Sequence, residues 1–266
     1  MKLTRGYDGL KIEAKSLAAV HDILTVEQPL SVQINGEPFT VTMQTPGHEK
    51  ELIRGLLFTE GVYKDRSSDL VWKEYLKSDD GTIYSVNLDI PVDRLDQSLL
   101  NKRSLLSVAS CGICGKTELN LPEGTLSADN LKLNVDSIAS MFGVMSRHQG
   151  AFISSGGCHA ASAFDESYSL LSVCEDIGRH NAVDKVIGDL LIQGSLPRAK
   201  YLLVSGRVSY EILVKSFVAG IPVLMAVSAP SSLAVDFATE LGITLMGFCR
   251  EGRATVYTHP ERILTA

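Results

Sequence analysis

Tyr201-Leu-Leu-Val204, Pro222-Val-Leu-Met-Ala-Val227 and Ile243-Thr-Leu-Met-Gly-Phe248 are three short apolar runs separated by two segments with helical spacing. Runs of this length that are apolar almost throughout are typical of strands buried on both faces of a parallel sheet. The intervening segments, Ser209 to Ala219 and Ser232 to Leu241, each stop at a glycine, as helices commonly do. This half of the chain is therefore predicted to be an α/β unit, with a mostly parallel sheet covered by helices on both faces.

The same alternation extends towards the middle of the chain. Ala151 to Ser154 and Leu170 to Cys174 are predicted strands, and a helix is expected to start at Asn181. Asp136 is predicted to cap another helix, because Ile138 and further apolar residues follow it at helical spacing.

The first half of the chain carries hairpin signals instead. Asn35-Gly36 separates two predicted strands, Leu30 to Ile34 and Glu37 to Met43, and Asp80-Gly81 separates Val71 to Leu76 from Thr82 to Leu88. A helix is expected between the hairpins, over His48 to Glu60. We therefore predict an N-terminal α+β domain over residues 1–125 and an α/β domain over residues 126–266, with the boundary in a stretch rich in turn formers.

Size and composition exclude several classes of protein. The chain has 266 residues, 45% of them hydrophobic, and a formal net charge of −6. A negative net charge argues against a general nucleic-acid or anionic-membrane binder, and no apolar run reaches the ~18 residues of a membrane-spanning helix. Unclustered cysteines without a secretory leader predict a reducing, cytoplasmic location.

Two of the five cysteines, Cys111 and Cys114, lie in the stretch Ser110-Cys-Gly-Ile-Cys-Gly115. The glycine after each disfavours a continuous helix, so we expect a loop that another protein can reach. A thiolate is the nucleophile in sulfur chemistry, and a neighbouring thiol or cation lowers its pKa. Such a loop is suited to accept a persulfide sulfur and to pass it on.

Three other interpretations of this cysteine pair stay open. It can be half of a zinc site, although Cys158, Cys174 and Cys249 are isolated and the histidines lack metal-ligand spacing. It can be a thioredoxin-like redox pair, although no clear helix follows it. It can also be two inert thiols placed by chance, which the flanking glycines disfavour. We therefore predict no metal site.

Polar and basic residues follow four of the predicted strands. In sheets of this kind, ligands bind beyond the carboxyl ends of the strands, where helix N-termini and arginines suit a phosphate. Ordinary capping and surface salt bridges explain any one of these loops equally well, but the four together favour a phosphorylated ligand. The chain has neither a P-loop nor a dinucleotide-binding glycine motif. The loops are Glu175 to Asn181, Ser205 to Arg207, Ser228 to Ser232 and Cys249 to Arg253.

A third group of residues is Ser155-Gly-Gly-Cys-His159-Ala-Ala161. Zinc deaminases use H-x-E followed by P-C-x-x-C, and the glutamate moves the protons. Here Ala161 stands at the glutamate position and no P-C-x-x-C follows. Deamination has no mechanism without these groups, so the segment is predicted to be a relic or the wall of a ligand pocket.

Taken together, these motifs resemble the formate dehydrogenase accessory sulfurtransferase family (FdhD/NarQ). The matching stretches span nearly the whole chain in order, which is more specific than any single motif. They are Gln28-Pro-Leu, Asn35-Gly36, Thr45-Pro-Gly-His48, Gly55 to Gly61, Ser110 to Gly115, Gly156 to Ala160, Glu175 to Lys185, Ser205 to Ser209, Val227 to Pro230, Gly247 to Arg250 and Tyr257 to Arg262.

The resemblance implies a sulfur carrier that takes persulfide sulfur from a cysteine desulfurase. It then delivers the sulfur to the molybdenum of a bis-molybdopterin guanine dinucleotide cofactor, which formate dehydrogenase requires. It also implies a homodimer, and a three-layer αβα second domain similar to cytidine deaminases.

By the motif, Cys111 carries the persulfide and Cys114 is the second acceptor or resolving thiol. Phe248, Cys249, Arg250, Glu251, Gly252 and Arg253 are expected to line the nucleotide site, with Arg179, His180, Ser205, Arg207 and Ser228 as companions. We treat the Cys158 and Cys249 side chains as small packing groups. Two rivals remain: a non-catalytic guanine-nucleotide-binding accessory protein with inert thiols, and a divergent deaminase-fold hydrolase.

Overall fold

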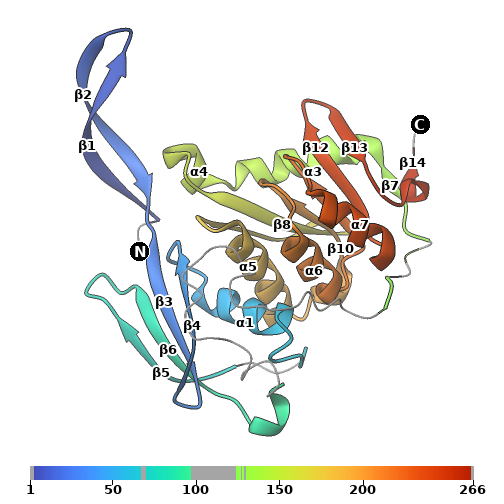
Figure 1. Ribbon diagram of the computed structural model, residues 1–266, viewed down its shortest axis with the longest axis horizontal. Helices are drawn as coiled ribbons and strands as arrows, with labels where there is room; N and C mark the ends of the chain where they lie inside the picture. The colour runs from blue at the N-terminus through green and yellow to red at the C-terminus, as the bar shows by residue number, and fades with distance from the viewer. Residues whose placement is uncertain (1–2, 67–69, 97–123, 127, 129, 265–266) are drawn as a thin grey trace.

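The computed structural model describes residues 3–66, 70–96, 124–126, 128 and 130–264 (Figure 1). Its largest element is a six-stranded sheet with the order β13-β12-β11-β10-β8-β9. The central strands alternate between two apolar clusters, so that Leu202 and Leu224 face one and Tyr201 and Leu203 face the other. The strands are β8 (His159–Asp165), β9 (Leu170–Asp176), β10 (Ala199–Val204), β11 (Val223–Ala226), β12 (Thr244–Arg250) and β13 (Arg253–Val256).

The sheet is mixed, so the prediction of a mostly parallel sheet is wrong: more of its neighbouring strands pair antiparallel than parallel. Four strands run in one direction, but β8 lies antiparallel between β9 and β10, and β13 is antiparallel to β12. The cause is two tight turns: the amide of Asp165 donates to the carbonyl of Ser169, 3.0 Å away, and Glu251-Gly252 links β12 to β13. So short a connection can join only antiparallel neighbours.

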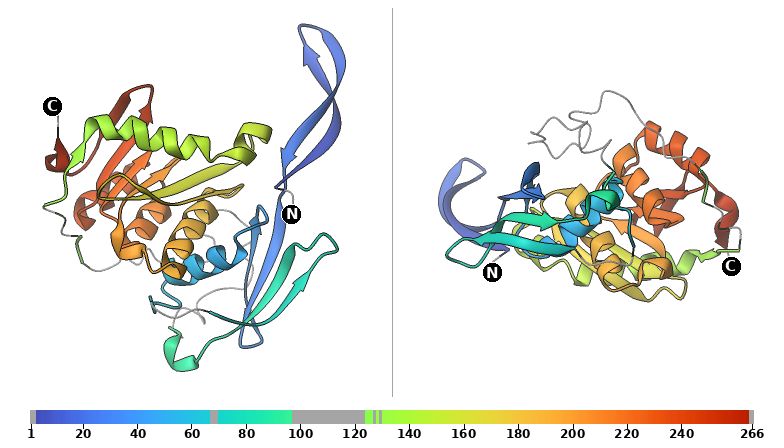
Figure 2. Two further views of the ribbon diagram at one scale, coloured as in Figure 1. Left: turned by 180° about the vertical axis from the view of Figure 1, so that it is seen from behind. Right: turned by 90° about the horizontal axis from the view of Figure 1, so that it is seen from below.

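Helices cover both faces of this sheet, which makes three layers (Figure 2). Helix α3 packs on one face through Ile138, Met141 and Met145, and α5, α6 and α7 lie on the other. The cap of α3 is Asn134, whose side chain accepts from the amide of Asp136 at 3.0 Å, so the prediction of Asp136 as the cap is wrong by two residues. The helices are α3 (Val135–Arg147), α5 (Arg179–Ile192), α6 (Tyr210–Ala219) and α7 (Ser232–Leu241).

A second correction concerns the predicted strand Ala151 to Ser154, which is part of the short helix α4 (Gly150–Ser155). Both carboxylate oxygens of Glu175 accept from its first turn, from the amides of Ala151 at 2.9 Å and Phe152 at 2.8 Å. A carboxylate at this end stabilises free amides and the positive end of the helix dipole. This contact comes from β9, and local sequence cannot reveal it.

The N-terminal half forms a four-stranded sheet with the order β4-β3-β6-β5. Both predicted hairpins are confirmed, and Asn35 and Gly36 have φ values of 55° and 87°, as a two-residue turn requires. The inward residues of β3, Leu30, Val32 and Ile34, pack on α1, whose predicted position is also confirmed. The elements are β3 (Gln28–Ile34), β4 (Glu37–Gln44), α1 (Glu49–Thr59), β5 (Val71–Lys77) and β6 (Ile83–Asp89).

Helix α1 joins the two halves by packing directly on α5 (Figure 1). A Cβ on Gly55 would overlap the carbonyl oxygen of Asp184 and lie 2.9 Å from the amide nitrogen of Gly188. A Cβ on Gly188 would overlap the carbonyl oxygen of Glu51 in the same way. The helices cross at their backbones because both positions are glycine.

A buried ion pair fastens this crossing to α6. The Nζ of Lys215 donates to both carboxylate oxygens of Asp184 at 2.8 Å and to the hydroxyl of Thr59 at 2.8 Å. Burial alone would lower the pKa of Lys215, but Asp184 and Glu60 raise it overall. Removing one partner would leave a buried charge unpaired, which is strongly destabilising.

A long hairpin precedes the N-terminal sheet and was not predicted from the sequence. Strands β1 (Thr4–Glu13) and β2 (Ser16–Thr25) pair along their whole length and project from the body as an arm (Figure 1). The remaining elements are the parallel pair β7 (Leu133–Asn134) and β14 (Ile263–Leu264) and the 3₁₀ turns η1 (Val92–Arg94), η2 (Leu196–Arg198) and η3 (Pro260–Arg262).

No helix in the described part of the chain has both the length and the apolarity to cross a membrane. The predicted domain boundary near residue 125 adjoins residues 97–123, outside the described part, and stays a prediction.

The helix crossing gives a stability prediction. We expect Gly188→Ala to lower the free energy of unfolding by about 1–3 kcal/mol or more, because the new methyl group would meet backbone atoms that cannot move aside. Urea unfolding followed by circular dichroism measures the loss. Gly143→Ala in α3 is the matched control, because its Cβ would have 3.8 Å of clearance, and it should be neutral or stabilising by up to ~1 kcal/mol. Equal stability of the two variants would contradict the backbone contact.

Candidate functional site at the carboxyl edge of the large sheet

The carboxyl ends of β9, β10, β11 and β12 meet at one edge of the six-stranded sheet, which we call the carboxyl edge. They do so although the sheet is mixed, because β8 is antiparallel to both of its neighbours and so leaves β9 and β10 running the same way. For the same reason β8 begins at this edge, where His159 pairs with Asp176. All four predicted loops therefore leave the sheet on one side.

The turn from β9 into α5 is held by a buried carboxylate, Asp176. It accepts from the amides of Thr45 at 3.1 Å and Gly178 at 2.8 Å and from the side-chain amide of Asn181 at 3.0 Å. Its ion pair with the Nζ of Lys185 spans 2.7 Å, and the same Nζ donates to the carbonyl of Thr45 at 2.8 Å. Every oxygen of this buried charge is thus satisfied, and the first turn of α5 is fixed.

Two predicted site residues, Arg179 and His180, lie in that first turn. The Nε of Arg179 is buried and has no hydrogen-bond partner among the described residues. His180 turns away towards the start of α6, with its Nε2 3.3 Å from the hydroxyl of Ser209 and 3.9 Å from a carboxylate oxygen of Glu211. A buried donor without a partner is costly, so Arg179 is the better of the two candidates for a ligand contact.

His159, at the start of β8, lies beside the turn that follows β10. It was not among the predicted site residues. A Cβ on Gly206 would lie 3.1 Å from its Nδ1 and 3.7 Å from the Cδ of Arg179, so glycine here lets both side chains lie over the turn. Burial, Arg179 and Arg207 lower the pKa of His159. The glycine pair before it, Gly156-Gly157, is the sequence signal that could have found it, because it allows the backbone to approach another group closely.

Ser205 and Ser228 mainly support this edge. The hydroxyl of Ser205 accepts from the amide of Ala160 at 2.9 Å, and the amide of Ser205 donates to the carbonyl of Ala160 at 2.9 Å. The carbonyl of Ser228 accepts from the amide of Phe248 at 3.2 Å. Each serine therefore holds neighbouring strand ends together.

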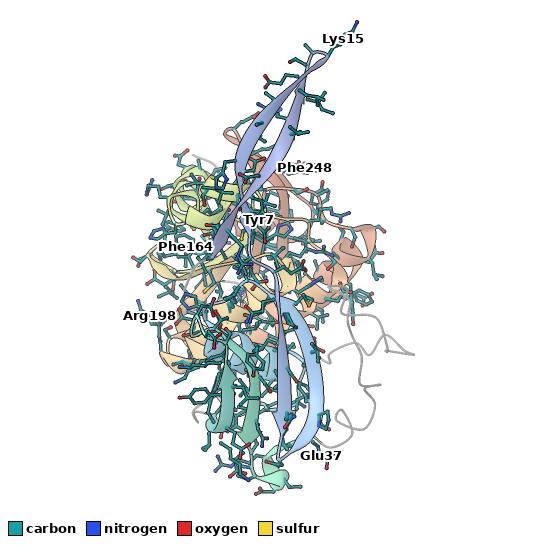
Figure 3. The ribbon with its side chains drawn as sticks, turned by 90° about the vertical axis from the view of Figure 1, so that its left-hand side faces the viewer. Tyr7, Lys15, Glu37, Phe164, Arg198 and Phe248 are labelled. Carbon is teal, nitrogen blue, oxygen red and sulfur yellow. The ribbon has the colours of Figure 1, made fainter. Side chains whose placement is uncertain are left out.

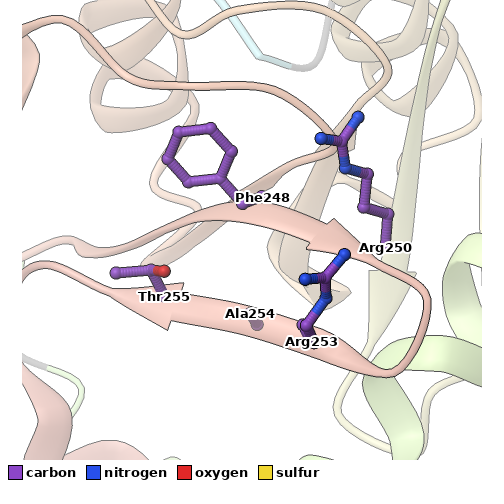
Figure 4. A pocket seen from close by; sticks show the side chains of 5 residues that line it. All are labelled: Phe248, Arg250, Arg253, Ala254 and Thr255. Atoms are coloured by element: carbon purple, nitrogen blue, oxygen red, sulfur yellow. The ribbon is translucent and has the colours of Figure 1, made fainter.

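The hairpin between β12 and β13 carries the predicted nucleotide stretch. Glu251 and Gly252 have φ values of 53° and 70°, which makes a two-residue turn with Arg250 and Arg253 paired on either side. Beside it lies a hollow of about 210 Å³ (Figure 4). It is lined by Phe248, Arg250, Arg253, Ala254 and Thr255.

Other members of the predicted stretch point elsewhere. Cys249 is 3% exposed and packs in the apolar cluster on the α3 side of the sheet, where burial raises the pKa of its thiol to about 11. It is a packing residue, and its side chain does not line the hollow. A carboxylate oxygen of Glu251 lies 2.6 Å from a guanidinium nitrogen of Arg253. Phe248, in contrast, lines the hollow; it is 41% exposed and has a φ of 55°, a strained value for an aromatic residue.

The carboxyl edge carries positive charge on an acidic protein. Arg179, Arg207 and Arg250 form no salt bridge with any described residue, and Arg253 pairs only with the exposed Glu251. The hollow lies about two strand spacings, or about 10 Å, along the edge from the β10 turn. An aromatic ring, free guanidinium groups and helix N-termini in this order suit a ligand with a planar base and phosphates.

Cys111 and Cys114 lie outside the described residues. The cysteines inside them, Cys158, Cys174 and Cys249, are buried free thiols. Residues 3–66, 70–96 and the described part beyond 123 hold no group of three side chains suited to bind a metal ion.

Comparison with known proteins gives a consistent result. The sequence model of the FdhD/NarQ family matches residues 25–264. Among curated proteins, sulfur carrier protein FdhD of Streptomyces avermitilis is 40% identical over 96% of this chain and 93% of its own. The protein of the same name from Saccharolobus solfataricus is 37% identical over 97% of both chains.

A solved structure shares the fold. A protein from Desulfotalea psychrophila, described as a formate dehydrogenase accessory protein, superposes with a TM-score of 0.76 over 99% of this chain and 100% of its own, at 23% identity.

The charges around His159 give a titration prediction. Replacing Arg179 by Gln should raise the pKa of His159, because it removes a cation that disfavours the imidazolium form. Arg207→Gln should raise it less, since Arg207 contributes less to the shift. NMR titration of the imidazole protons measures both values. Arg198→Gln, whose guanidinium pairs with Asp165 at the opposite end of β10, is the control and should leave the pKa unchanged. No change in the Arg179 variant would show that the two side chains are not close.

Proposed function

Since the chain belongs to the FdhD/NarQ family, we propose that it is a sulfurtransferase that carries persulfide sulfur from a cysteine desulfurase to the molybdenum cofactor of formate dehydrogenase. The family match over residues 25–264, which includes the Cys111–Cys114 motif, is the observation that carries the proposal. The relatives are named sulfur carrier proteins, which supports a role for this chain in carrying sulfur. We further propose that the sulfur donor is a cysteine desulfurase, that the acceptor is the molybdenum cofactor, and that the protein acts in the cytoplasm.

The first chemical step is the transfer of a sulfur atom between thiols. The thiolate of Cys111 attacks the outer sulfur of the donor persulfide, a new S–S bond forms at Cys111, and the donor cysteine leaves as a thiolate. No net oxidation occurs, because one S–S bond replaces another. The buried cysteines are unsuited to this role, since burial raises the pKa of Cys174 to about 12 and a thiol is a poor nucleophile.

The second step releases the sulfur. The thiolate of Cys114 attacks the inner sulfur of the Cys111 persulfide, which breaks its S–S bond and forms a Cys111–Cys114 disulfide. The outer sulfur leaves with the electron pair as hydrosulfide and takes up one proton. The two cysteines are thereby oxidised, and a cellular thiol reductant must restore them before the next cycle.

We propose that the bis-molybdopterin guanine dinucleotide cofactor binds along the carboxyl edge as the substrate of this transfer. The hollow is smaller than the ~300–1,000 Å³ of pockets that enclose a whole ligand, so it would hold only one end of so large a molecule. Phe248 offers a face for the guanine ring, with Arg250 and Arg253 for the adjoining phosphates. Arg179 and Arg207 lie further along the edge, and the unpaired Nε of Arg179 supports an anion there.

The fold assignment of residues 126–266 as similar to cytidine deaminases is part of this proposal. The three layers around the six-stranded sheet support it. Ala161 replaces the glutamate that deamination needs, so we propose that the unit binds a nucleotide without hydrolysing it.

Persulfide loading gives the first test. After incubation with a cysteine desulfurase and cysteine, mass spectrometry without reductant should show one added sulfur on the peptide that contains Cys111 and Cys114. Cys111→Ala should abolish the adduct. Cys114→Ala should load normally but release hydrosulfide slowly, because the resolving thiolate is missing. Cys174→Ala is the control and should behave like the unaltered protein. Absence of any adduct, with the desulfurase active on another acceptor, would favour a guanine-nucleotide-binding accessory protein.

Nucleotide binding gives the second test, with GDP as the probe. The double variant Arg250→Gln, Arg253→Gln should weaken GDP binding about 100-fold or more, because two hydrogen bonds from charged donors are lost. Isothermal titration calorimetry measures the dissociation constant. Arg94→Gln, Arg198→Gln removes the same charge from outside the carboxyl edge and should bind GDP normally. Both double variants should still accept persulfide, and unchanged GDP affinity in the first would contradict the assignment of the hollow.

A further inference from the structure

His159 stands at the carboxyl edge, and the proposed sulfur transfer gives it no role. It is partly buried at the start of β8, and neither of its ring nitrogens forms a hydrogen bond with a described residue. Polar groups withdrawn from water are normally paired in native proteins. Both ring nitrogens of this imidazole are therefore available to a ligand, one as a donor and the other as an acceptor in the neutral form.

Gly206 makes room for His159 beside Arg179. A Cβ on Gly206 would lie 3.1 Å from the Nδ1 of His159 and 3.7 Å from the Cδ of Arg179, so both side chains lie over the turn that leads to Arg207. The Nε of Arg179 is buried there without a hydrogen-bond partner in the described part of the chain. A donor in this state costs free energy until a partner arrives. We call His159, Arg179, Gly206 and Arg207 the histidine–arginine cluster.

The described groups that face His159 leave this cluster with positive charge. They come from three elements: Asp176 in β9, Arg179 in α5 and Arg207 in the turn after β10. Asp176 is neutralised by the Nζ of Lys185 at 2.7 Å, whereas neither arginine forms a salt bridge with a described residue. Burial and the two arginines lower the pKa of His159, so the imidazole is neutral at pH 7 while two guanidinium charges remain uncompensated.

Two helices also begin beside the cluster. Helix α5 starts at Arg179, and α6 starts three residues after Arg207. The N-cap residues, Gly178 and Ser209, make no side-chain hydrogen bond to the first turns of these helices. Amides and the helix dipole at such ends favour an anion. Together with two arginines, they suit an anion with two charges and several acceptor oxygens, which is the chemistry of a phosphate group.

We propose that the histidine–arginine cluster is a second anion site of the carboxyl edge, which binds a phosphate group and takes up one proton on His159 as it does so. An anion between Arg179 and Arg207 cancels the repulsion that keeps the imidazole neutral. The ring then binds a proton from solvent and donates a charge-assisted hydrogen bond to the anion. No covalent bond changes in this step.

The cluster is separate from the hollow, which lies about 10 Å along the edge. A nucleotide in the hollow and an anion at the cluster can therefore be bound at the same time. The inference rests on the proposed function only for the source of the phosphate group, which we assign to the part of the cofactor that extends beyond the hollow. The anion site itself uses neither the hollow nor the Cys111–Cys114 motif.

The test uses sulfate as the probe on the full chain, because sulfate has the shape and charge of a phosphate dianion and does not titrate between about pH 5 and 8, where histidine does. Isothermal titration calorimetry in buffers of different ionisation enthalpy, with the hollow saturated by GDP, should show uptake of up to one proton for each sulfate bound. The affinity should rise as the pH falls towards the lowered pKa of His159 and level off below it.

Two variants of His159 separate a ligand contact from a purely structural role. His159→Gln should bind sulfate about 10-fold more weakly at low pH, without proton uptake, because glutamine does not titrate. His159→Lys should also lack proton uptake but should keep the affinity, because lysine carries a permanent charge. His21→Gln is the control and should retain proton uptake, since His21 lies exposed on the arm, where it pairs with Asp8. Circular dichroism should show that all three variants are folded.

The arginines give a matched pair of variants. Arg179→Gln should weaken sulfate binding about 10-fold or more, because it removes a charged donor. Arg198→Gln removes the same charge and should leave sulfate binding unchanged, since the Arg198 side chain lies well apart from Phe248 at the carboxyl edge (Figure 3).

Three outcomes would overturn the proposal. Sulfate binding without proton uptake, or with equal uptake in His159→Gln, would remove His159 from the site. Displacement of sulfate by GDP would show that the cluster belongs to the hollow. Failure of the isolated cofactor to displace sulfate would overturn the assignment of the phosphate group to the cofactor. GDP affinity and persulfide loading, measured on the same samples, keep the two proposals apart: their loss with sulfate binding intact would contradict the proposed function alone.

Discussion

The backbone contact between α1 and α5 is the constraint on which the rest of the structure depends. Gly55 and Gly188 let the two helices touch without side chains between them, and this close approach holds the N-terminal sheet, which packs on α1, beside the helix-covered face of the large sheet. Helix α5 begins with the residues that lead into the carboxyl edge, so its position decides where Arg179 points. The second anchor is Asp176, whose hydrogen bond to the amide of Thr45 and ion pair with Lys185 tie the start of α5 to the N-terminal sheet. Through these contacts, the described part of the N-terminal half fixes the geometry of the site.

At the carboxyl edge, the direction of the strands matters more than their pairing, because the direction decides which loops lie together. The insertion of β8 between β9 and β10 changes only which strands pair. The carboxyl ends of β9, β10, β11 and β12 still meet on one side of the sheet. The insertion also adds the start of β8, and with it His159, to the edge. Alternation along β12 then sorts the predicted nucleotide stretch, so that Phe248 and Arg250 face the hollow while Cys249 packs into the core. An acidic chain can hold a local basic groove because its arginines are placed at strand ends and its buried carboxylates are already paired.

Much of this could be predicted from the sequence because its signals are local. Asn35-Gly36 fixes a turn by its own backbone preference, and the helices before Gly220 and Gly242 end where glycine adopts positive φ. The misses come from contacts between distant segments. Helix α4 depends on the carboxylate of Glu175, and the arm turns at Ala14 and Lys15, which adopt positive φ without the usual glycine or asparagine. His159 was predicted only as part of a relic or a pocket wall, because nothing nearby in sequence shows that Arg179 and Gly206 lie next to it. The predicted roles of Cys111 and Cys114 stay predictions, since both lie outside the described residues.

The position of the arm has a consequence for the site. At its root, the hydroxyl of Thr25 lies 2.6 Å from the hydroxyl of Ser155 and 3.5 Å from the sulfur of Cys158, and Cys158 directly precedes His159 at the carboxyl edge. A Cβ on Gly157 would lie 2.7 Å from the same hydroxyl, so the root of the arm fits closely against the segment that leads into β8. The arm's root and the start of β8 therefore fix each other's position.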